Sequence, residues 1–413
     1  MPPPRIIATF ALAMAVSHSA SAQEWAEWRG PGRDGVVPEA NVLERWPDAF
    51  APTWQVEIGR GYSSPVVSGG RVFVHSRREP VEVVTAVDLA TGDRVWQREY
   101  RADFTENGLA PVGLKGPFAT PLVAGDRLFT LGVSGVLSSW DVATGELLWR
   151  NDYASLTSTA ELFGGTAASP VRVADRVIVQ VGNDLDGGRV LALDPATGAE
   201  MWSWTGVGPG YASPILINVD GVRHLVTLTE DSIIGLDVAN GSLLWTALFP
   251  DEWHENIMTP VWTGTHLIVS GPRQGTHAFR LSRAGDRWRA AEAWANTDVT
   301  MYMSSPVFAG GTLYGHSSRR RGQFFALDAA TGTLEWASEG REGEHAAVLL
   351  ARDNLILLTD EAELIVAKPD TTTFTVAARY RVADGATWAV PVLLRDGLLV
   401  RDATTLARLA AAR

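Results

Sequence analysis

One short pattern returns along almost the whole chain, and it restricts the fold more than any other feature of the sequence. A typical copy opens with Ser or Thr before Pro and a short apolar strand, and it closes with Asp, a Thr-Gly turn and Trp. The first copy runs from Ser63-Ser64-Pro65 to Asp88, Thr91-Gly92 and Trp96. Successive copies start roughly 42–56 residues apart, which is the spacing of four-stranded propeller blades.

Eight copies can be recognised, and the last is short. The seventh, from Ala346 to Tyr380, has lost its Pro, Gly and Trp, and the eighth begins at Val390-Pro391 with room for only three strands. The segment Thr53–Ile58 resembles the missing outer strand. We therefore expect an all-β, eight-bladed β-propeller of four-stranded antiparallel blades, whose ring is closed by an N-terminal strand pairing with the C-terminal blade. Seven blades plus a loose hairpin is the alternative.

A Trp near the end of each outer strand is interpreted as structural. A large ring that recurs in most copies is expected to pack between neighbouring blades rather than to bind a ligand. The blade residues expected in this role are Trp54, Trp96, Trp149, Trp202, Trp245, Trp288 and Trp336.

The chain is expected to contain three segments. Residues 1–22 have the pattern of a cleavable signal peptide, with Arg5, a short apolar run and the A-x-A-like site Ala20-Ser21-Ala22. Residues 23–52 form a leader, and residues 53–413 form a single propeller domain. The apolar run is too short to span a bilayer. We therefore expect a periplasmic or secreted protein without a transmembrane segment.

Composition narrows the range of partners. The chain has no cysteine and a formal net charge of −12. The lack of cysteine excludes disulfides, thiolate metal sites and a lipid anchor on a cysteine. The negative charge argues against nucleic acid as a partner. We expect a monomer that binds a protein or peptide.

The repeat resembles the Trp-docking repeat of the PQQ-like β-propeller superfamily. The resemblance rests on Ala86–Trp96, with further copies at Ala192–Trp202 and Ala326–Trp336, and on the leader Trp25–Gly35. It implies one of two roles. Quinoprotein dehydrogenases bind PQQ and usually Ca²⁺ over the axis, whereas BamB-type propellers bind proteins and no quinone. Here no cysteine can form the vicinal disulfide of many such dehydrogenases, and few residues remain to roof a quinone. The BamB type is therefore favoured.

Strand direction places the loops of each blade on two faces. With strands A to D counted outward from the axis, A–B and C–D turns share one face, and B–C and D–A loops share the other. The sequence of the first face is explained by the Gly residues that its turns need for folding. Recognition of a partner is therefore assigned to the second face. The candidate binding residues on that face are Arg60, Tyr62, Arg77, Arg78, Lys115, Phe118, Tyr211, His254, Glu255, Asn256, Arg273, Tyr302, Arg319, Arg320, His345 and Trp388.

We therefore expect a non-catalytic binding scaffold with no cofactor, no metal and no catalytic residue. The alternatives are a PQQ- and Ca²⁺-dependent quinoprotein oxidoreductase acting on an alcohol or sugar, and a propeller that binds a small molecule or sugar. His254 and Glu255 with Glu344 and His345 could ligate a metal, but they lack a local ligand spacing. The acidic turn Asp184–Gly188 lacks the remaining acids of a Ca²⁺ loop.

Overall fold

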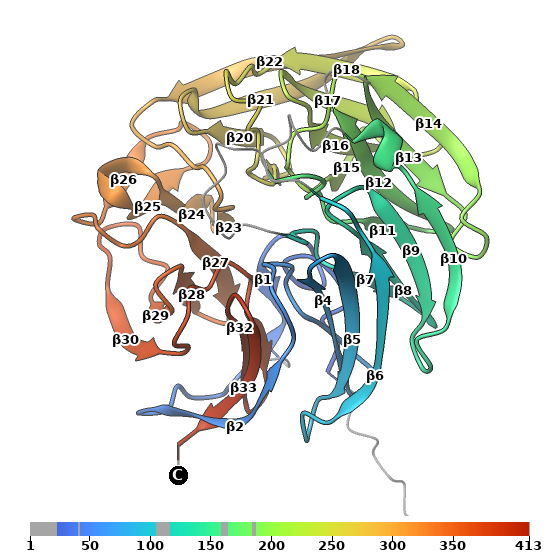
Figure 1. Cartoon of the computed structure of the whole chain (residues 1–413). Helices are drawn as coiled ribbons and strands as arrows, with labels where there is room; N and C mark the ends of the chain where they lie inside the picture. The colour runs from blue at the N-terminus through green and yellow to red at the C-terminus, as the bar shows by residue number, and fades with distance from the viewer. Residues whose placement is uncertain (1–22, 40–41, 105–115, 158–163, 184–186, 413) are drawn as a thin grey trace, which may run out of the picture.

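The strands form eight sheets around a central axis, and the chain passes once round the ring (Figure 1). The computed structural model describes residues 23–39, 42–104, 116–157, 164–183 and 187–412. In each blade the strands are hydrogen-bonded neighbours in chain order, except where N-terminal strands are added to blades 7 and 8. The expected eight-bladed all-β propeller is confirmed. The expected signal peptide lies outside the described residues.

The strands of blades 1 to 4 are β3 (Val66–Ser68), β4 (Arg71–Arg78), β5 (Val81–Asp88) and β6 (Arg94–Arg101); β7 (Leu122–Ala124), β8 (Arg127–Leu131), β9 (Val136–Asp141) and β10 (Leu147–Asp152); β11 (Val171–Val173), β12 (Arg176–Asn183), β13 (Gly187–Leu193) and β14 (Glu200–Gly206); β15 (Ile215–Val219), β16 (Val222–Leu228), β17 (Ser232–Asp237) and β18 (Leu243–Leu248).

The strands of blades 5 to 8 are β19 (Val261–Trp262), β20 (Leu267–Gly271), β21 (Gly275–Ala284) and β22 (Arg287–Asn296); β23 (Val307–Ala309), β24 (Thr312–Ser317), β25 (Gln323–Asp328) and β26 (Leu334–Ala337); β27 (Ala346–Ala351), β28 (Asn354–Thr359), β29 (Glu363–Ala367) and β30 (Val376–Arg381); β31 (Val392–Leu394), β32 (Gly397–Arg401) and β33 (Thr405–Ala411). Two 3-10 turns, η2 (Ala154–Leu156) and η3 (Arg319–Arg321), lie in loops, and among the described residues no helix is long and apolar enough to cross a membrane.

The ring is closed by the N-terminal strand β2 (Phe50–Glu57). It pairs antiparallel with β33 as the outer strand of blade 8, with Phe50 opposite Ala411 and Glu57 opposite Thr405 (Figure 1). Trp54 on this strand donates its indole N–H to the carbonyl of Leu89 in blade 1 at 3.0 Å. One strand therefore completes the last blade and fastens it to the first, as expected.

Most blades are joined by the same tryptophan contact. The indole N–H donates to a carbonyl in the C–D turn of the next blade, as Trp96 does to Val142 at 3.1 Å. The indole ring also covers the glycine of that turn. A Cβ added to Gly145 would lie 2.6 Å from the Trp96 indole. Gly145 has φ +71°, so glycine is needed here both for the conformation of the turn and for the close approach of the Trp96 indole.

Blade 5 departs from the expected arrangement because its outer hairpin is long. Strands β21 and β22 have ten residues each, and Trp294, not Trp288, pairs opposite Ala278 and donates to the carbonyl of Ala329 at 3.2 Å. Trp288 instead packs edge-on against His224 of blade 4, with ring centroids 4.4 Å apart. The docking residue of blade 5 is thus Trp294.

The leader crosses the ring on the face of the A–B turns. Its strand β1 (Val36–Val37) pairs parallel with β27, and Trp25 forms a two-way backbone bridge with Val67 of β3 at 2.8 Å. Trp25 is fully buried in the core cluster shared by blades 7, 8 and 1. The segment expected to be a separate leader is therefore packed into the propeller.

Candidate functional site

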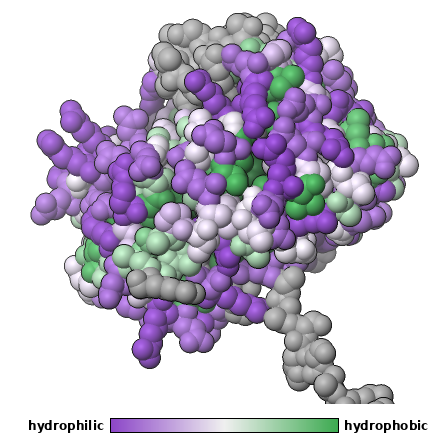
Figure 2. Space-filling view, turned by 60° about the horizontal axis from the view of Figure 1, so that its bottom comes forward, coloured by the Kyte–Doolittle hydropathy of each residue, from purple (hydrophilic) through white to green (hydrophobic). Residues whose placement is uncertain are grey.

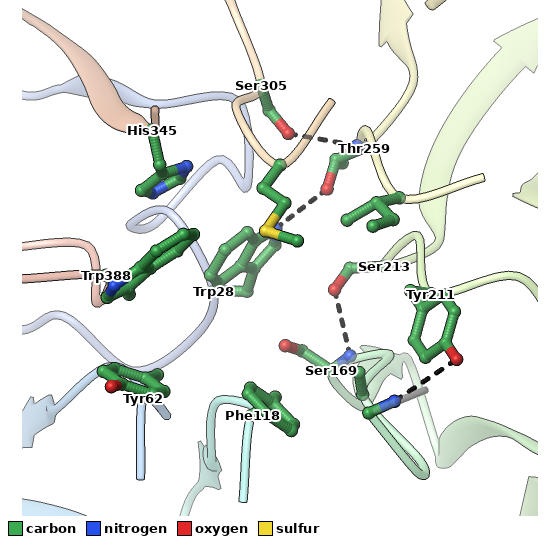
Figure 3. A pocket seen from close by; sticks show the side chains of 14 residues that line it. Trp28, Tyr62, Phe118, Ser169, Tyr211, Ser213, Thr259, Ser305, His345 and Trp388 are labelled. Carbon is green, nitrogen blue, oxygen red and sulfur yellow. Dashed lines mark hydrogen bonds between the residues drawn. The ribbon is translucent and has the colours of Figure 1, made fainter. Parts of the chain in front are cut away.

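A small cavity opens on the axis at the end where the D–A loops meet, and we call it the axial cup. Each blade supplies one side chain to its wall, from the position three residues before the Pro of the repeat or its equivalent in blade 7. The cavity has a volume of about 150 Å³, and Trp28 of the leader also lines it (Figure 3). The eight wall residues are Tyr62, Phe118, Ala167, Tyr211, Ile257, Met303, His345 and Trp388.

Below this wall, a chain of hydrogen bonds fixes the blades to one another. The amide of Thr120 donates to the hydroxyl of Ser169 at 3.0 Å, and the amide of Ser169 donates to the hydroxyl of Ser213 at 2.9 Å. Thr259 and Ser305 repeat the contact at 3.0 Å (Figure 3). Because the hydroxyls of Ser64, Thr120, Ser169, Ser213 and Ser305 each accept from the preceding blade, the wall residues next to them are held on a rigid frame.

Aromatic rings line a continuous arc of the cup, contributed by blades 7, 8, 1 and 2. His345 stacks on Trp388 with ring centroids 5.2 Å apart and an interplanar angle of 7°. Trp388 meets Tyr62 edge-on at 6.0 Å, and Tyr62 stacks against Phe118 at 6.2 Å. Except for His345, which is buried, these side chains are half-buried and present apolar surface to the cavity.

The lining of the cup is uncharged at neutral pH. Burial, reinforced by the nearby His316, lowers the pKa of His345 to about 3, so its imidazole is neutral. Its Nδ1 lies 3.2 Å from the hydroxyl of Ser304. Among the described residues that line the cavity there is no Asp, Glu, Lys or Arg. The cup therefore favours an uncharged group.

The leader seals the floor of the cup. The indole N–H of Trp28 donates to the hydroxyl of Thr259 at 3.1 Å (Figure 3). The buried guanidinium of Arg29 donates to the carbonyl of Pro306 at 2.6 Å, and that of Arg33 donates to the carbonyl of Pro170 at 2.9 Å. These arginines satisfy carbonyls at the starts of inner strands, which have no partner in their own sheets.

A third buried arginine, Arg401, lies beside Tyr62. Arg401 of β32 donates to the carbonyls of Ser63 and His75, the latter at 2.8 Å, and burial lowers its pKa to about 9. A Cβ added to Gly61, which has φ +127°, would lie 3.1 Å from this guanidinium. Glycine at 61 thus lets the chain pass close to Arg401 and turn Tyr62 toward the cup.

Other expected site residues lie in separate groups. Arg60 and Arg78 are exposed and line a recess at the B–C loop of blade 1, while Arg77 is buried there and forms a two-way backbone bridge with Arg60. Arg319 and Arg320 are exposed on η3. Lys115 lies outside the described residues, as do Asp184 and Asp186.

A third group lies between the loops of blades 4, 5 and 6. Tyr302 donates its hydroxyl to Glu255 at 2.6 Å, and burial raises the pKa of Glu255. His254 lies 2.8 Å from a carboxylate oxygen of Glu230, and the Arg273 guanidinium lies 5.2 Å above the exposed Trp253 ring.

Asn256, expected on the binding face, is instead buried. Its amide donates to the carbonyls of Thr229, Glu230 and Phe249 at 2.9, 3.1 and 2.9 Å. These contacts tie the loop between blades 4 and 5 to the turn of blade 4. Its role in the fold is therefore to hold the loop that carries His254 and Glu255.

The residues of the cup do not fit PQQ with Ca²⁺. The quinone carries three carboxylates, and the described residues of the lining offer no cation to meet them and no carboxylate for a Ca²⁺ ion. Among the described residues, no group of three or more His, Cys, Asp or Glu side chains is arranged to hold a metal. His254 and His345, considered together as ligands from the sequence, have separate partners.

Four members of the cup were not recognised from the sequence: Ala167, Ile257, Met303 and Trp28. The first three occupy the same repeat position as Tyr62 and Phe118. Alignment of the repeats on their Pro would have found them, whereas residue type alone did not. Trp28 belongs to the leader, outside the repeat, and no local pattern places it on the axis.

Comparison with known proteins identifies the family. The family model of the outer membrane protein assembly factor BamB matches residues 81–338, which is more than half of the chain. BamB of Shewanella oneidensis is 30% identical over 156 residues, covering 36% of this chain and 35% of that protein. BamB of Yersinia pestis is 26% identical over 264 residues, covering 63% and 60%. The matched regions thus span about a third to three fifths of these relatives.

Solved structures show the same fold. BamB from Moraxella catarrhalis superposes with a TM-score of 0.60 at 14% identity, covering 88% of this chain and 98% of that one. A europium-containing methanol dehydrogenase superposes with a TM-score of 0.65 at 13% identity, covering 94% and 98%. The fold alone therefore accommodates both binding proteins and enzymes. The sequence match decides between the families, and the chain belongs to the BamB family of PQQ-like β-propellers.

Proposed function

We propose that this protein is a non-catalytic scaffold that binds a protein or peptide partner on the face of the B–C and D–A loops. The observation that carries the proposal is the axial cup, an apolar, uncharged recess open at that face and sealed beneath by the leader. The relatives named as outer membrane protein assembly factors support a role in that process, in the periplasm.

The rest of the surface supports recognition at this face. In the view of Figure 2 the surface is mainly hydrophilic, and its apolar residues lie in small separate patches. On the loop that also carries Ile257 of the cup, Trp253 is 52% exposed beside Arg273. Trp and Arg are the side chains that most often dominate the energy of protein interfaces. The partner is therefore expected to contact the cup and this neighbouring pair.

Site-specific photo-crosslinking in the exported fraction tests the proposal. A photoreactive residue at Trp253 should give protein adducts, and the same residue at the exposed Arg223, in β16 beside the A–B turn of blade 4, should not. Equal labelling from both positions would contradict the assignment of the face. Dye-linked oxidation of an alcohol after addition of PQQ and Ca²⁺ would instead support the enzymatic alternative.

A further inference from the structure

We propose that the axial cup binds one uncharged aromatic side chain of the partner, inserted along the axis from the D–A loop side. The inference rests on the proposed function, because that function supplies the polypeptide that carries the ring. It goes further by assigning the chemistry of the group that is recognised and the place where it is bound.

The size of the cup matches one ring. Its volume of about 150 Å³ is that of an engineered apolar cavity that binds benzene. Trp28 closes the floor, so a longer chain has no passage through the axis. A single phenyl group fills this space, whereas a folded element does not enter it.

The lining selects against charge. His345 is neutral, and the lining residues that the structure describes include no ionised side chain. A carboxylate or ammonium placed among them would lose its hydration without gaining a counter-ion. The hydroxyls of Ser169, Ser213, Thr259 and Ser305 already accept hydrogen bonds from neighbouring blades or from Trp28. The lining therefore favours a ligand group that makes apolar contacts over one that needs hydrogen bonds.

The arrangement of the rings favours an aromatic guest over an aliphatic one. The stacked pairs His345–Trp388 and Tyr62–Phe118 meet edge-on at Trp388 and Tyr62, so the wall offers both ring faces and ring edges. Aromatic pairs gain energy in offset and edge-to-face geometries beyond the area that they bury. The Met303 side chain adds a polarisable thioether to the opposite wall.

Ala167 provides the sharpest variant, because it is the one small residue among the eight wall positions. Ala167→Trp should fill the cup with the chain's own indole without removing any existing contact, and Ala167→Ser is the matched control. If Ala167→Trp lowers the melting temperature strongly, Ala167→Leu replaces it as a smaller filling group.

The test measures binding of N-acetyl-phenylalanine amide and N-acetyl-glutamate amide to the full-length protein by ligand-observed NMR. We expect binding of the phenylalanine amide only, at least tenfold weaker in Ala167→Trp and unchanged in Ala167→Ser. Equal binding of the two amides, or phenylalanine-amide binding unaffected by Ala167→Trp, would overturn the proposal.

Selection of a displayed peptide library on the same protein separates this inference from the function on which it rests. The inference predicts that selected peptides share an aromatic residue and lose binding in Ala167→Trp. Peptides that lose binding on Arg273→Glu, contain no shared aromatic residue and ignore Ala167→Trp would refute the inference and leave the scaffold function standing. Binding of the phenylalanine amide without any peptide or crosslinked partner would refute the scaffold function instead.

Discussion

The two ends of the propeller axis are built from the same eight blades, yet their contacts differ in kind. At the sealed end, Arg29 and Arg33 donate to the carbonyls of inner strands, and Trp25 is fully buried. At the open end, five of the eight wall positions of the cup carry rings, four of them half-buried. The end packed with buried leader side chains is expected to stabilise the ring of blades, while the end with uncovered apolar surface can receive a ligand.

The largest expected effect is a loss of stability that differs between substitutions at the two ends of the axis. Trp25→Ala removes a fully buried indole and should lower the free energy of unfolding by about 3–5 kcal/mol. Phe118→Ala, at the half-buried rim of the cup, should cost less than half as much. Equilibrium unfolding in urea measures both. Similar losses of unfolding free energy in the two variants would contradict the proposed difference between the two ends.

Arg33→Ala tests whether the hydrogen bonds of the sealed end matter beyond apolar burial. The buried guanidinium donates to the carbonyls of Pro170 and Pro214 at 2.9 and 3.2 Å, and its loss leaves these acceptors unpaired. We expect a destabilisation of about 2 kcal/mol. The matched change Arg60→Ala, at an exposed position, should stay within about 0.5 kcal/mol. Calorimetry of the two variants provides the measurement.

The open end should be sensitive to acid. Burial depresses the pKa of His345 to about 3, so the unfolded chain binds a proton more readily than the fold does. The stability from this group is complete above pH 6.5 and falls as the pH drops toward 3. Between pH 7 and pH 5, His345→Gln should lose less stability than the wild type, by on the order of 1–2 kcal/mol. Urea titrations at several pH values test this, and identical pH profiles would contradict it.

The smallest expected effect on stability is at the exposed part of the open face. Arg273 stacks above Trp253 and pairs with Glu252 at 3.7 Å, and exposed pairs of this kind contribute little. Arg273→Ala should change the free energy of unfolding by less than about 0.5 kcal/mol while reducing the yield of adducts at Trp253. A large loss of stability would show that this pair belongs to the framework.

The repeat allowed most of the fold to be predicted, because its Pro, Asp, Gly and Trp each have one structural reason to recur. The closing strand at Trp54 was predicted for that reason. The prediction was less accurate in blade 5, where a lengthened hairpin moved the docking position to Trp294 and composition could not distinguish it from Trp288.

The candidate site was predicted only in part. Tyr62, Phe118, Tyr211, His345 and Trp388 were named from the sequence and do meet in the cup. Arg77 and Asn256 were named with them and are buried, because loop position does not reveal which way a side chain turns. Trp28 was missed, since its place depends on a long-range path that no local pattern encodes.

The pairing of β2 with β33 also has a consequence for biosynthesis. Strand β2 is synthesised before the blades and its partner β33 after them, so the blades made in between have unpaired edges until β33 is complete. Cleavage between β32 and β33 in the mature protein would recreate that state. Such open edges can pair with another chain to form an intermolecular β-sheet. Strand β33 therefore protects the protein against self-association from the end of its synthesis onward.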